Sequence, residues 1–567
     1  MYLFAIELLL AAFVHARCYE PSQAYPLPEY DPQDALLRRT FASIKSALTI
    51  AVARPEFAAT SFSVEVTSSK ESLWSQHHTA KERNSSRPDI ERVNGDALYR
   101  IASITKSFTT LGILYQHAAG NLSLDDSIDT YIDELRGKQD GSIPWKDITL
   151  RTLASQLSGI PREFAQSDLI NLPNPERFGL PPVSRDGLLR CDEYAPDYDP
   201  PYLFESIKSK PPLFAPNQQS TYSNVAFELL GLAIENATGQ DYESYINDAI
   251  FKPLSMTKST LSKPPDRAGV IPKGPHYWDV DEGVQSPTGG IYSSSTDLSK
   301  YLRYILKHYN AITDAANWAH SASPAVGLRS FYGMSWEIFR TDNILLNSKR
   351  PVTFVTKSGG LPGYVSIIMY LPEYDLGFTI LVAGNSALIR TIREVVTVAV
   401  VRAAEALAIK QLQKRYAATY ASDSDLNSSV TLVADHRGLV VTEFISNGTD
   451  VFTIYAEHGG VPKDRPWYAQ LVPTLLYQDE KSQEGAKWRA TIVEERIGQS
   501  TDVWDEFCTT DLDLASYAGL PLNEFVLWEG KGGVIDAIEL TAFRIKLSRE
   551  QGNNSGMGDP QQEIPEL

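Results

Sequence analysis

The sequence predicts an α+β domain followed by an all-β domain. In the first part of the chain, segments with apolar residues at helical spacing are interspersed with short strands, and residues 366–370 and 377–383 look like two strands of one antiparallel sheet. Beyond Tyr416, alternating β-branched and aromatic runs are separated by Gly, Asn and Asp turns, which is typical of a barrel or sandwich. The 567 residues are too many for a single core, which favours two or three domains.

The N-terminal elements lead toward one helix. The first strand expected is 62–66, with Trp74 in a partner strand. A short apolar run at 97–101 then opens a helix, and Gly120 stands where a helix C-cap belongs. The apolar face of that helix is carried at helical spacing by Ile104, Phe108, Leu111 and Tyr115.

The middle of the chain contains a long segment with little periodicity. Residues 162–216 are rich in Pro, Asp and Tyr, which indicates a lid or binding loop, or else a Pro-rich spacer without a role of its own. A helix with Phe227 on its apolar face follows, and a helix around 395–412 closes the first domain. The expected domains are therefore a signal peptide at 1–16, an α+β domain at 32–412, a β domain at 416–549 and a disordered tail at 550–567. The strand runs expected in the β domain are 430–433, 439–444, 467–472, 488–493, 525–528 and 538–545.

Ser103 and Lys106 stand at the start of the helix that follows residue 101. A side chain three residues on lies one turn away on the same helix face, so an unprotonated Lys106 amine can reach the Ser103 hydroxyl and act as its base. For this the pKa of Lys106 must fall through burial and neighbouring positive charge. Ser-x-x-Lys is a weak pattern alone, and it recurs at 255–258, which follows Pro253 and Leu254 and reads as a loop.

Two further motifs follow in order. They are Tyr222-x-Asn224 and Lys357-Ser358-Gly359, the latter on an expected strand that leads into a glycine turn. A second Tyr-x-Asn at 245–247 lies inside an expected helix with no turn before it. The order of the three motifs and their local structure together make a strong signal for nucleophilic catalysis.

On these motifs, the sequence resembles the serine β-lactamase and penicillin-binding-protein superfamily, in particular its class C β-lactamase and D-alanyl-D-alanine carboxypeptidase branch. The resemblance covers about 36–412 and includes 153–159, 250–256 and Gly289-Gly290. It implies the β-lactamase/transpeptidase-like fold, an antiparallel sheet flanked by helices with an all-helical subdomain. The β domain then resembles the lipocalin-like appendages of some relatives, which complete the substrate site, or is a stability or assembly module. Two departures are Ser358 in place of Thr, which keeps the hydroxyl, and Gln156 where many relatives have histidine.

The resemblance also implies a role for each motif residue. Ser103 would attack a carbonyl and become acylated, and Lys106 would take its proton or hold the network that does. Tyr222 would pass a proton to the leaving group and, with Lys106, activate the deacylating water. Substrate binding would involve Asn224 for an amide, and Lys357, Ser358 and Gly359, with Lys357 and Ser358 holding an acidic group. The oxyanion hole would come from the backbone N–H groups of Ser103 and Gly360, where glycine lets the strand edge approach closely.

The bulk properties exclude several classes of function. A formal charge of −18 with no Lys/Arg-rich run argues against nucleic-acid binding and against an anionic membrane surface. No second apolar run is long enough to span a bilayer. Cys18, Cys191 and Cys508 allow one disulfide, and the sequence cannot choose the pair. No metal-ligand spacing is present, so we expect neither a metal nor another cofactor, and the oligomeric state is open.

The N-terminus indicates secretion. Residues 8–14 are apolar and 14–16 read as a cleavage site, although a buried N-terminal helix is the alternative because no basic residue precedes the run. A secretory route agrees with candidate glycosylation sequons, which begin at Asn84, Asn121, Asn236, Asn427, Asn447 and Asn553.

Three functions fit these observations. The first is a secreted serine hydrolase that cleaves an amide or ester through an acyl-enzyme on Ser103. The second is an acyltransferase or transesterase with the same site, which passes the acyl group to an amine or alcohol and so tailors a natural product. The third is an inert binding protein on the same fold. The absence of a Gly-x-Ser-x-Gly elbow argues against an α/β-hydrolase.

Overall fold

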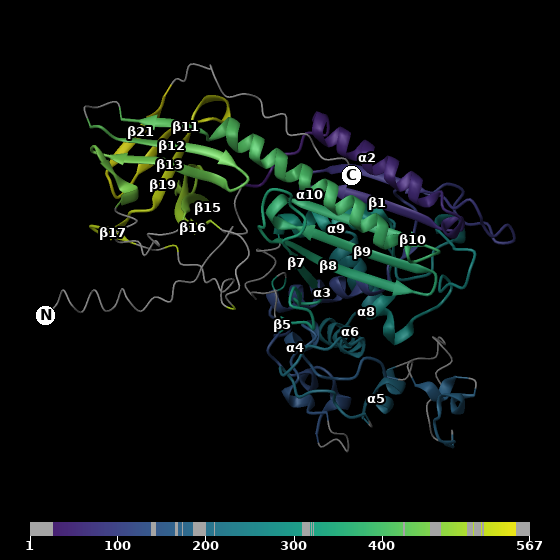
Figure 1. The fold of residues 1–567 in the computed structure, drawn as a ribbon. Coiled ribbons are helices and arrows are strands. Elements are labelled where there is room, and N and C mark those ends of the chain that lie inside the picture. The colour runs from purple at the N-terminus through teal and green to yellow at the C-terminus, as the bar shows by residue number, and fades with distance from the viewer. Residues whose placement is uncertain are drawn as a thin grey trace. The chain divides into compact units, whose positions relative to one another are not determined.

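The computed structural model, shown as a ribbon in Figure 1, describes two compact units. The first unit comprises Pro32–Arg340 and Thr353–Val398, and the second contains the remaining described residues. The described residues are 26–137, 143–164, 168–172, 174–184, 200–208, 210–308, 318, 320, 323–422, 426–453, 466–495, 503, 512 and 515–550. The expected signal peptide, all three cysteines, Asn553 and most of the expected tail lie outside these ranges.

One large sheet forms the frame of the first unit. Its strands follow the spatial order β2, β1, β10, β9, β8, β7, β6, β5. Neighbouring strands are antiparallel throughout the run from β2 to β8 and throughout the run from β7 to β5. The predicted strands at 62–66, 366–370 and 377–383 are confirmed as β1, β9 and β10, and Trp74 lies in β2. The bounds are β1 Ser61–Thr67, β2 Ser72–His78, β5 Ser323–Pro324, β6 Ser330–Tyr332, β7 Glu337–Thr341, β8 Val352–Leu361, β9 Tyr364–Leu371 and β10 Leu376–Ala383.

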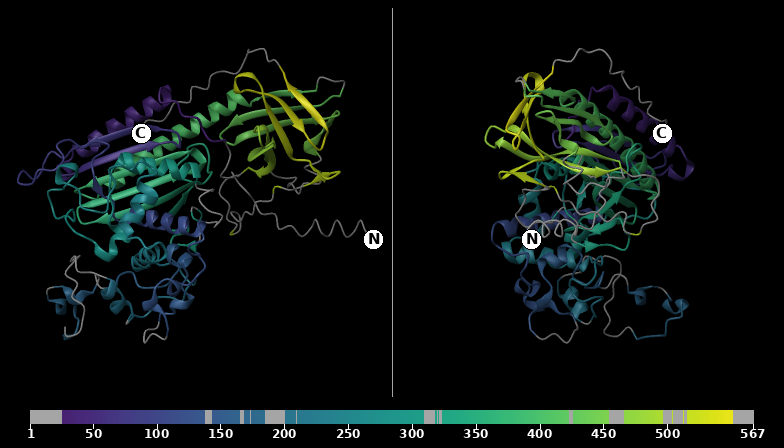
Figure 2. Two further views of the ribbon diagram at one scale, coloured as in Figure 1. Left: turned by 180° about the vertical axis from the view of Figure 1, so that it is seen from behind. Right: turned by 60° about the vertical axis from the view of Figure 1, so that its left-hand side comes forward.

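Helices cover both faces of this sheet, as two of the views show (Figures 1 and 2). Helix α2 (Ala35–Val52) contacts the sheet at β2, where Phe41 stacks on Trp74 with ring centroids 5.4 Å apart. Helix α9 (Ser295–His308) packs against β1 and β10 on the other face. Because both faces are covered, every residue of β1 and β10 is buried. Strand β10 accordingly reads as a nearly continuous apolar run, whereas in β1 polar residues that are also buried alternate with apolar ones.

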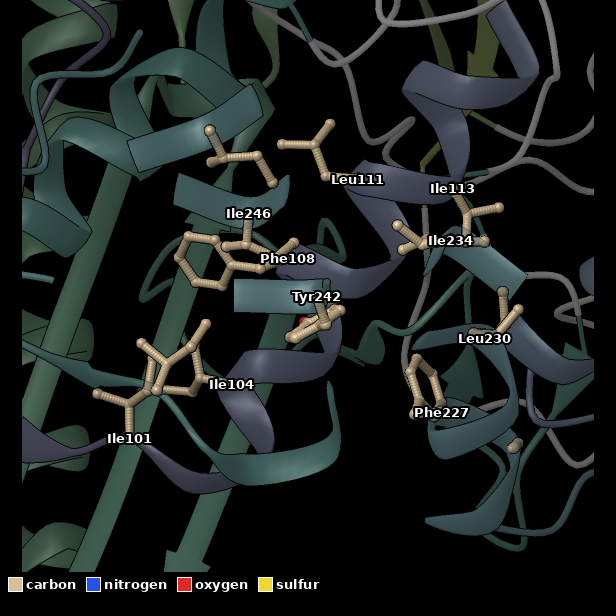
Figure 3. Packing of buried hydrophobic residues seen from close by; sticks show 14 of the residues in the cluster. Ile101, Ile104, Phe108, Leu111, Ile113, Phe227, Leu230, Ile234, Tyr242 and Ile246 are labelled. Atoms are coloured by element: carbon tan, nitrogen blue, oxygen red, sulfur yellow. The ribbon is translucent and has the colours of Figure 1, made fainter. Parts of the chain in front are cut away.

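The helical part of the first unit surrounds α3 (Thr105–Ala118), which packs against α6 and α8. Phe108 and Leu111 of α3 and Phe227 of α6 are fully buried, as the sequence pattern predicted, and Figure 3 shows their packing. Gly120 follows the helix in the left-handed conformation, with a φ of 74°. The other helices here are α4 Leu150–Ala154, α5 Pro200–Lys208, α6 Val225–Thr238, α7 Tyr242–Ile246 and α8 Ser286–Gly289, and a two-stranded sheet joins β3 Tyr99–Arg100 to β4 Tyr292–Ser293.

The second unit contains a closed barrel, which is the first of the two alternatives that the sequence left open. Eight of the described strands form the ring, in the order β11, β12, β13, β15, β16, β19, β20, β21. Each is antiparallel to its neighbours in this order, and β21 pairs with β11 to close the ring. Its interior is apolar, with Phe444, Trp488 and Phe525 buried together. The strands are β11 Ala418–Ala421, β12 Ser429–Asp435, β13 Gly438–Ser446, β15 Trp467–Asp479, β16 Glu484–Glu494, β19 Glu524–Glu529, β20 Ile535–Leu540 and β21 Ile545–Arg549, with the short β14 Thr449–Asp450 on β13 and a β17 Ser516–Tyr517 and β18 Leu520–Pro521 hairpin.

Two segments differ from the sequence-based expectation. The run at 538–545 is two strands, β20 and β21, because a turn ending in the left-handed Arg544 (φ 54°) separates them. The closing helix α10 runs from Leu388 to Arg415, longer at its start than the expected 395–412. Among the described helices, none is both long and apolar enough to cross a bilayer.

Candidate active site

Ser103 lies in a single helical turn that joins β3 to α3. This turn, η2 (Ala102–Ile104), begins at Ala102, whose φ of 49° is unusual for a residue with a side chain. Two hydrogen bonds fix the backbone just before it: Ile101 N–H donates to Ile291 O (3.1 Å), and Ser366 Oγ donates to Ile101 O (2.8 Å). The serine is thereby held against β9 at the mouth of α3, and its side chain remains half-exposed.

Lys106 is fully buried and faces Ser103. Its Nζ lies 3.1 Å from Ser103 Oγ and donates to Thr288 O at 3.0 Å. Burial lowers the pKa of this ammonium, and the positive charge of Lys357 lowers it further, although Tyr222 opposes the shift. A lysine in this setting gives up its proton more easily than one in water.

Tyr222 lies in the loop before α6, and Gln156 holds the backbone on both sides of it. The Gln156 side chain accepts from Ser223 N–H at 2.6 Å, and its backbone carbonyl accepts from Thr221 N–H at 2.9 Å. Gln156 is 2% exposed and has a φ of 60°. The departure from histidine noted in the sequence therefore falls at a residue that positions Tyr222.

Three cations surround the Tyr222 ring. Lys106 Nζ lies 5.2 Å from the ring centroid, Lys357 Nζ 5.3 Å and Arg162 Cζ 4.8 Å. Burial raises the pKa of the phenol, but the charges of Lys106 and Lys357 together with a hydrogen bond from Ser103 outweigh it, so the pKa of Tyr222 is lowered. The motif residues Ser103, Lys106 and Tyr222 are thus brought together from distant parts of the chain.

Lys357 and Ser358 lie on β8 and contact an acidic group of the chain itself. Lys357 Nζ donates to Glu337 Oε1 at 2.5 Å, and Ser358 N–H and Oγ–H donate to Glu337 Oε2 at 3.0 and 2.7 Å. Burial lowers the pKa of Lys357, but the carboxylate of Glu337 outweighs it and the net pKa is raised. The two residues that the sequence assigned to an acidic substrate group are therefore engaged by Glu337.

The two glycines after Ser358 differ in their surroundings. A Cβ on Gly359 would lie 2.2 Å from Ile101 O and 3.0 Å from Ser103 N, so only glycine fits there. A Cβ on Gly360 would meet no atom within 4 Å among the described residues. The close approach of β8 to the serine turn is thus made at Gly359, and the expectation that Gly360 makes it was wrong.

Asn224 is paired with an acidic residue that the motifs did not include. Its Nδ2 donates to Glu163, and its backbone N–H donates to Arg162 O at 2.8 Å. Asn224 Oδ1 is buried and has no hydrogen-bond partner among the described residues. Burial raises the pKa of Glu163, although Asn224 and Arg162 oppose the shift. Asn224 thus presents a free amide oxygen next to Tyr222.

Sequence reasoning missed Glu163, Glu337 and the role of Gln156. Glu163 lies just after the Ser158-Gly159 turn. This turn packs against Phe214, whose backbone oxygen would lie 2.1 Å from a Cβ on Gly159. The surroundings of Glu163 therefore depend on a contact between residues far apart in the sequence. Two predictions about repeated motifs are confirmed. Residues 255–258 form a turn with Ser255 at a φ of 56°, and Tyr245 of the second Tyr-x-Asn lies in α7. Within the described residues no cluster of three His, Cys, Asp or Glu side chains could hold a metal ion.

Comparison with known proteins identifies the family. A family model described as Beta-lactamase matches residues 57–395, and one described as Beta-lactamase-like-like, C-terminal domain, matches 408–551. Probable hydrolase M10 of Phoma sp. is 32% identical over 93% of this chain and 91% of its own length, and probable hydrolase clz13 of Cochliobolus lunatus is 31% identical over 96% and 94%. A β-lactamase-like protein of Arthroderma benhamiae is 29% identical over 70% and 67%.

Part of this chain is also similar to solved structures. A β-lactamase/D-alanine carboxypeptidase from Yersinia pestis is 20% identical and covers 65% of this chain and 97% of its own, with a TM-score of 0.49. A class C β-lactamase is 19% identical over 65% and 96%, with a TM-score of 0.47. Because one family model matches more than half of the chain and two relatives exceed 30% identity over nearly all of it, this chain belongs to the Beta-lactamase family.

Proposed function

We propose that the protein is a serine hydrolase that cleaves an ester or amide through an acyl-enzyme on Ser103. The observation that carries the proposal is the 3.1 Å separation between Lys106 Nζ and Ser103 Oγ, with the Lys106 amine buried, its pKa lowered, and the Tyr222 phenol beside it. This distance lies within hydrogen-bond reach, which a nucleophile and its base require. The names of two relatives that match over nearly all of this chain, both probable hydrolases, agree with it.

The reaction follows from these groups. Lys106 Nζ accepts the Ser103 proton as Oγ forms a bond to the substrate carbonyl carbon. The tetrahedral intermediate then breaks its bond to the leaving oxygen or nitrogen, which takes a proton from Tyr222, and Tyr222 recovers one from Lys106. In deacylation Tyr222 passes its proton to the neutral Lys106 as it takes one from the water that attacks the Ser103 ester. The tetrahedral intermediate then breaks its bond to Ser103 Oγ, which takes the proton from Tyr222, and Tyr222 recovers its own from Lys106 as the acid leaves.

The backbone N–H groups of Ser103 and Gly360 would stabilise the oxyanion. Ser358 N–H points toward β7, where it donates to Glu337, and successive residues of a strand alternate in direction. Gly360, two residues further on, therefore directs its N–H to the same side of β8. Losing one such donor costs about 10²–10³-fold in rate. Asn224 would hold a substrate amide, and Lys357, Ser358 and Gly359 complete the substrate site, where Glu337 accepts hydrogen bonds from Lys357 and Ser358.

A fluorophosphonate probe tests this proposal. We expect it to label Ser103 in the wild-type chain and not in Ser103→Ala, with mass spectrometry identifying the modified peptide. A screen of β-lactams, D-amino peptides and short acyl esters should then find turnover that depends on Ser103. A folded wild-type chain that neither reacts with the probe nor turns over any substrate would be a binding protein.

An added alcohol or amine separates hydrolysis from acyl transfer. If the protein is a hydrolase, the acid remains the main product when the nucleophile is added at millimolar concentration. If the transferred ester or amide dominates instead, the protein is an acyltransferase with the same acyl-enzyme. The measurement is the product ratio at equal total turnover.

We also propose that the protein is secreted and carries N-linked glycans. Support comes from the exposed positions of four candidate asparagines, Asn121, Asn236, Asn427 and Asn447, and the partly exposed position of Asn84. Expression in a eukaryotic host should give protein in the medium whose mass falls on treatment with an N-glycosidase. Retention inside the cells, with no mass change, would contradict the proposal.

A further inference from the structure

Glu337 offers its carboxylate to the same donors that an acidic substrate would need. It accepts three hydrogen bonds from Lys357 and Ser358, at 2.5, 3.0 and 2.7 Å, and so uses both of its oxygens. Charge-assisted bonds of this kind are among the strongest in proteins. The donors include the ammonium, the hydroxyl and the backbone N–H of the Lys-Ser-Gly motif, so the anion-binding groups of the motif are occupied by the chain itself.

The sheet fixes Glu337 in this place. Strand β7 lies beside β8 in the sheet, and Thr356 Oγ donates to the backbone carbonyl of Glu337 at 2.7 Å. Glu337 is the first residue of β7 and follows Trp336, which is fully buried against Tyr370 with ring centroids 5.1 Å apart. Because the backbone is anchored on both counts, the Glu337 side chain starts from a fixed position beside Lys357.

Glu337 is negatively charged where it contacts Lys357. Burial raises its pKa, but the Lys357 ammonium and the hydrogen bonds from Lys357 and Ser358 outweigh it, so the pKa of Glu337 is lowered and it is a carboxylate at neutral pH. Its side chain is 28% exposed, whereas that of Lys357 is 1% exposed. A second anion reaching Lys357 would therefore meet Glu337 first.

We infer that Glu337 is an internal substitute for a substrate carboxylate, so that the site selects esters or amides without an anionic group at this position. This inference rests on the function proposed above. A substrate carboxylate could bind only beside or in place of Glu337, and either arrangement would set two carboxylates against one ammonium. A neutral substrate leaves the Glu337–Lys357 pair intact and incurs no such repulsion.

A matched pair of esters measures this selectivity. The two substrates are the acetate esters of 3-hydroxybenzoate and of 3-hydroxybenzamide. The first carries a carboxylate where the second carries a neutral carboxamide, and the ester that is cleaved is the same in both. We expect the wild-type kcat/KM to be at least about 100-fold higher for the benzamide ester than for the benzoate ester. Glu337→Gln should reduce this ratio of the two kcat/KM values at least about tenfold. The ratio is used because it cancels any common effect of the substitution on folding or on catalysis. Glu56→Gln, which removes an exposed glutamate, should leave the ratio unchanged.

Calorimetry with benzoate measures anion binding at Lys357 and Ser358 independently of catalysis. We expect Glu337→Gln and Glu337→Ala to bind benzoate and the wild-type chain not to bind it, with Lys357→Met in the Gln background abolishing binding. Equal benzoate binding by wild type and both variants, or none by any of them, would overturn the inference, as would an unchanged ester ratio in Glu337→Gln. Failure of Ser103 to react with a fluorophosphonate would instead overturn the proposed function, and the benzoate result would still stand.

Discussion

The side-chain oxygen of Gln156 accepts a hydrogen bond from the backbone N–H of Ser223 at 2.6 Å, while its backbone carbonyl accepts from Thr221. Both neighbours of Tyr222 are thus held by one buried residue. In Gln156→Ala the Ser223 N–H loses its partner, which costs about 1–3 kcal/mol, and Tyr222 is free to move. Because a displacement of about 1 Å can cost about 10²-fold in rate, we expect a kcat/KM loss of that order.

The measurement is kcat/KM for a neutral ester together with the melting temperature. Gln156→His, which keeps an acceptor nitrogen, should recover part of the rate, and Gln240→Ala, at an exposed glutamine, should change neither quantity. If the rate loss merely matches the fraction of unfolded protein at the assay temperature, Gln156 does not position Tyr222.

Gly359→Ala and Gly360→Ala should differ sharply. The Cβ added at 359 would meet the Ile101 carbonyl at 2.2 Å, so either β8 or the serine turn must move, while the Cβ added at 360 meets nothing among the described residues. We expect Gly359→Ala to lower the melting temperature and to slow fluorophosphonate labelling of Ser103 at least about 100-fold. Gly360→Ala should keep the wild-type melting temperature. Equal melting temperatures for the two variants would contradict this account.

The sequence predicted the parts of the fold that depend on local periodicity. Helix α3 and strand β1 were predicted because their apolar residues repeat at the period of the element, and β9 and β10 because each is a short run rich in apolar and β-branched residues. The proximity of Ser103, Lys106, Tyr222 and Lys357 was predicted from the short motifs that contain them. Glu337 was missed because its partnership with Lys357, 20 residues away, exists only through the position of β7 beside β8. An acidic residue at a strand start has no signature of its own, and only the sheet gives it a role.

The positive charge of Lys357 should set the pH dependence of catalysis. Burial and Lys357 lower the pKa of Lys106, and Lys357 also lowers that of Tyr222. Both groups therefore lose their protons below the ordinary values of 10.5 and 10.0, and the acidic limb of kcat/KM should lie below pH 10. In Lys357→Met that limb should move to higher pH, because the positive charge that lowers the pKa of both Lys106 and Tyr222 is removed. Lys146→Met, at an exposed lysine, is the control, and a limb that stays in place would exclude this coupling.

Glu228 of α6 should make the free energy of unfolding depend on pH. Its side chain is fully buried, neither carboxyl oxygen has a hydrogen-bond partner among the described residues, and burial together with the negative charge of Glu163 raises its pKa well above 4.5. The folded state then binds a proton that the unfolded chain releases above pH 4.5. The stabilisation is fully present below that pH and is lost as the pH rises toward the folded pKa, at up to about 1.4 kcal/mol per pH unit. Glu228→Gln has no proton to lose, so its free energy of unfolding relative to wild type should rise between pH 4.5 and neutrality in denaturant titrations. With Glu56→Gln as the control, parallel curves for wild type and Glu228→Gln across this range would mean that the buried carboxyl does not titrate as inferred.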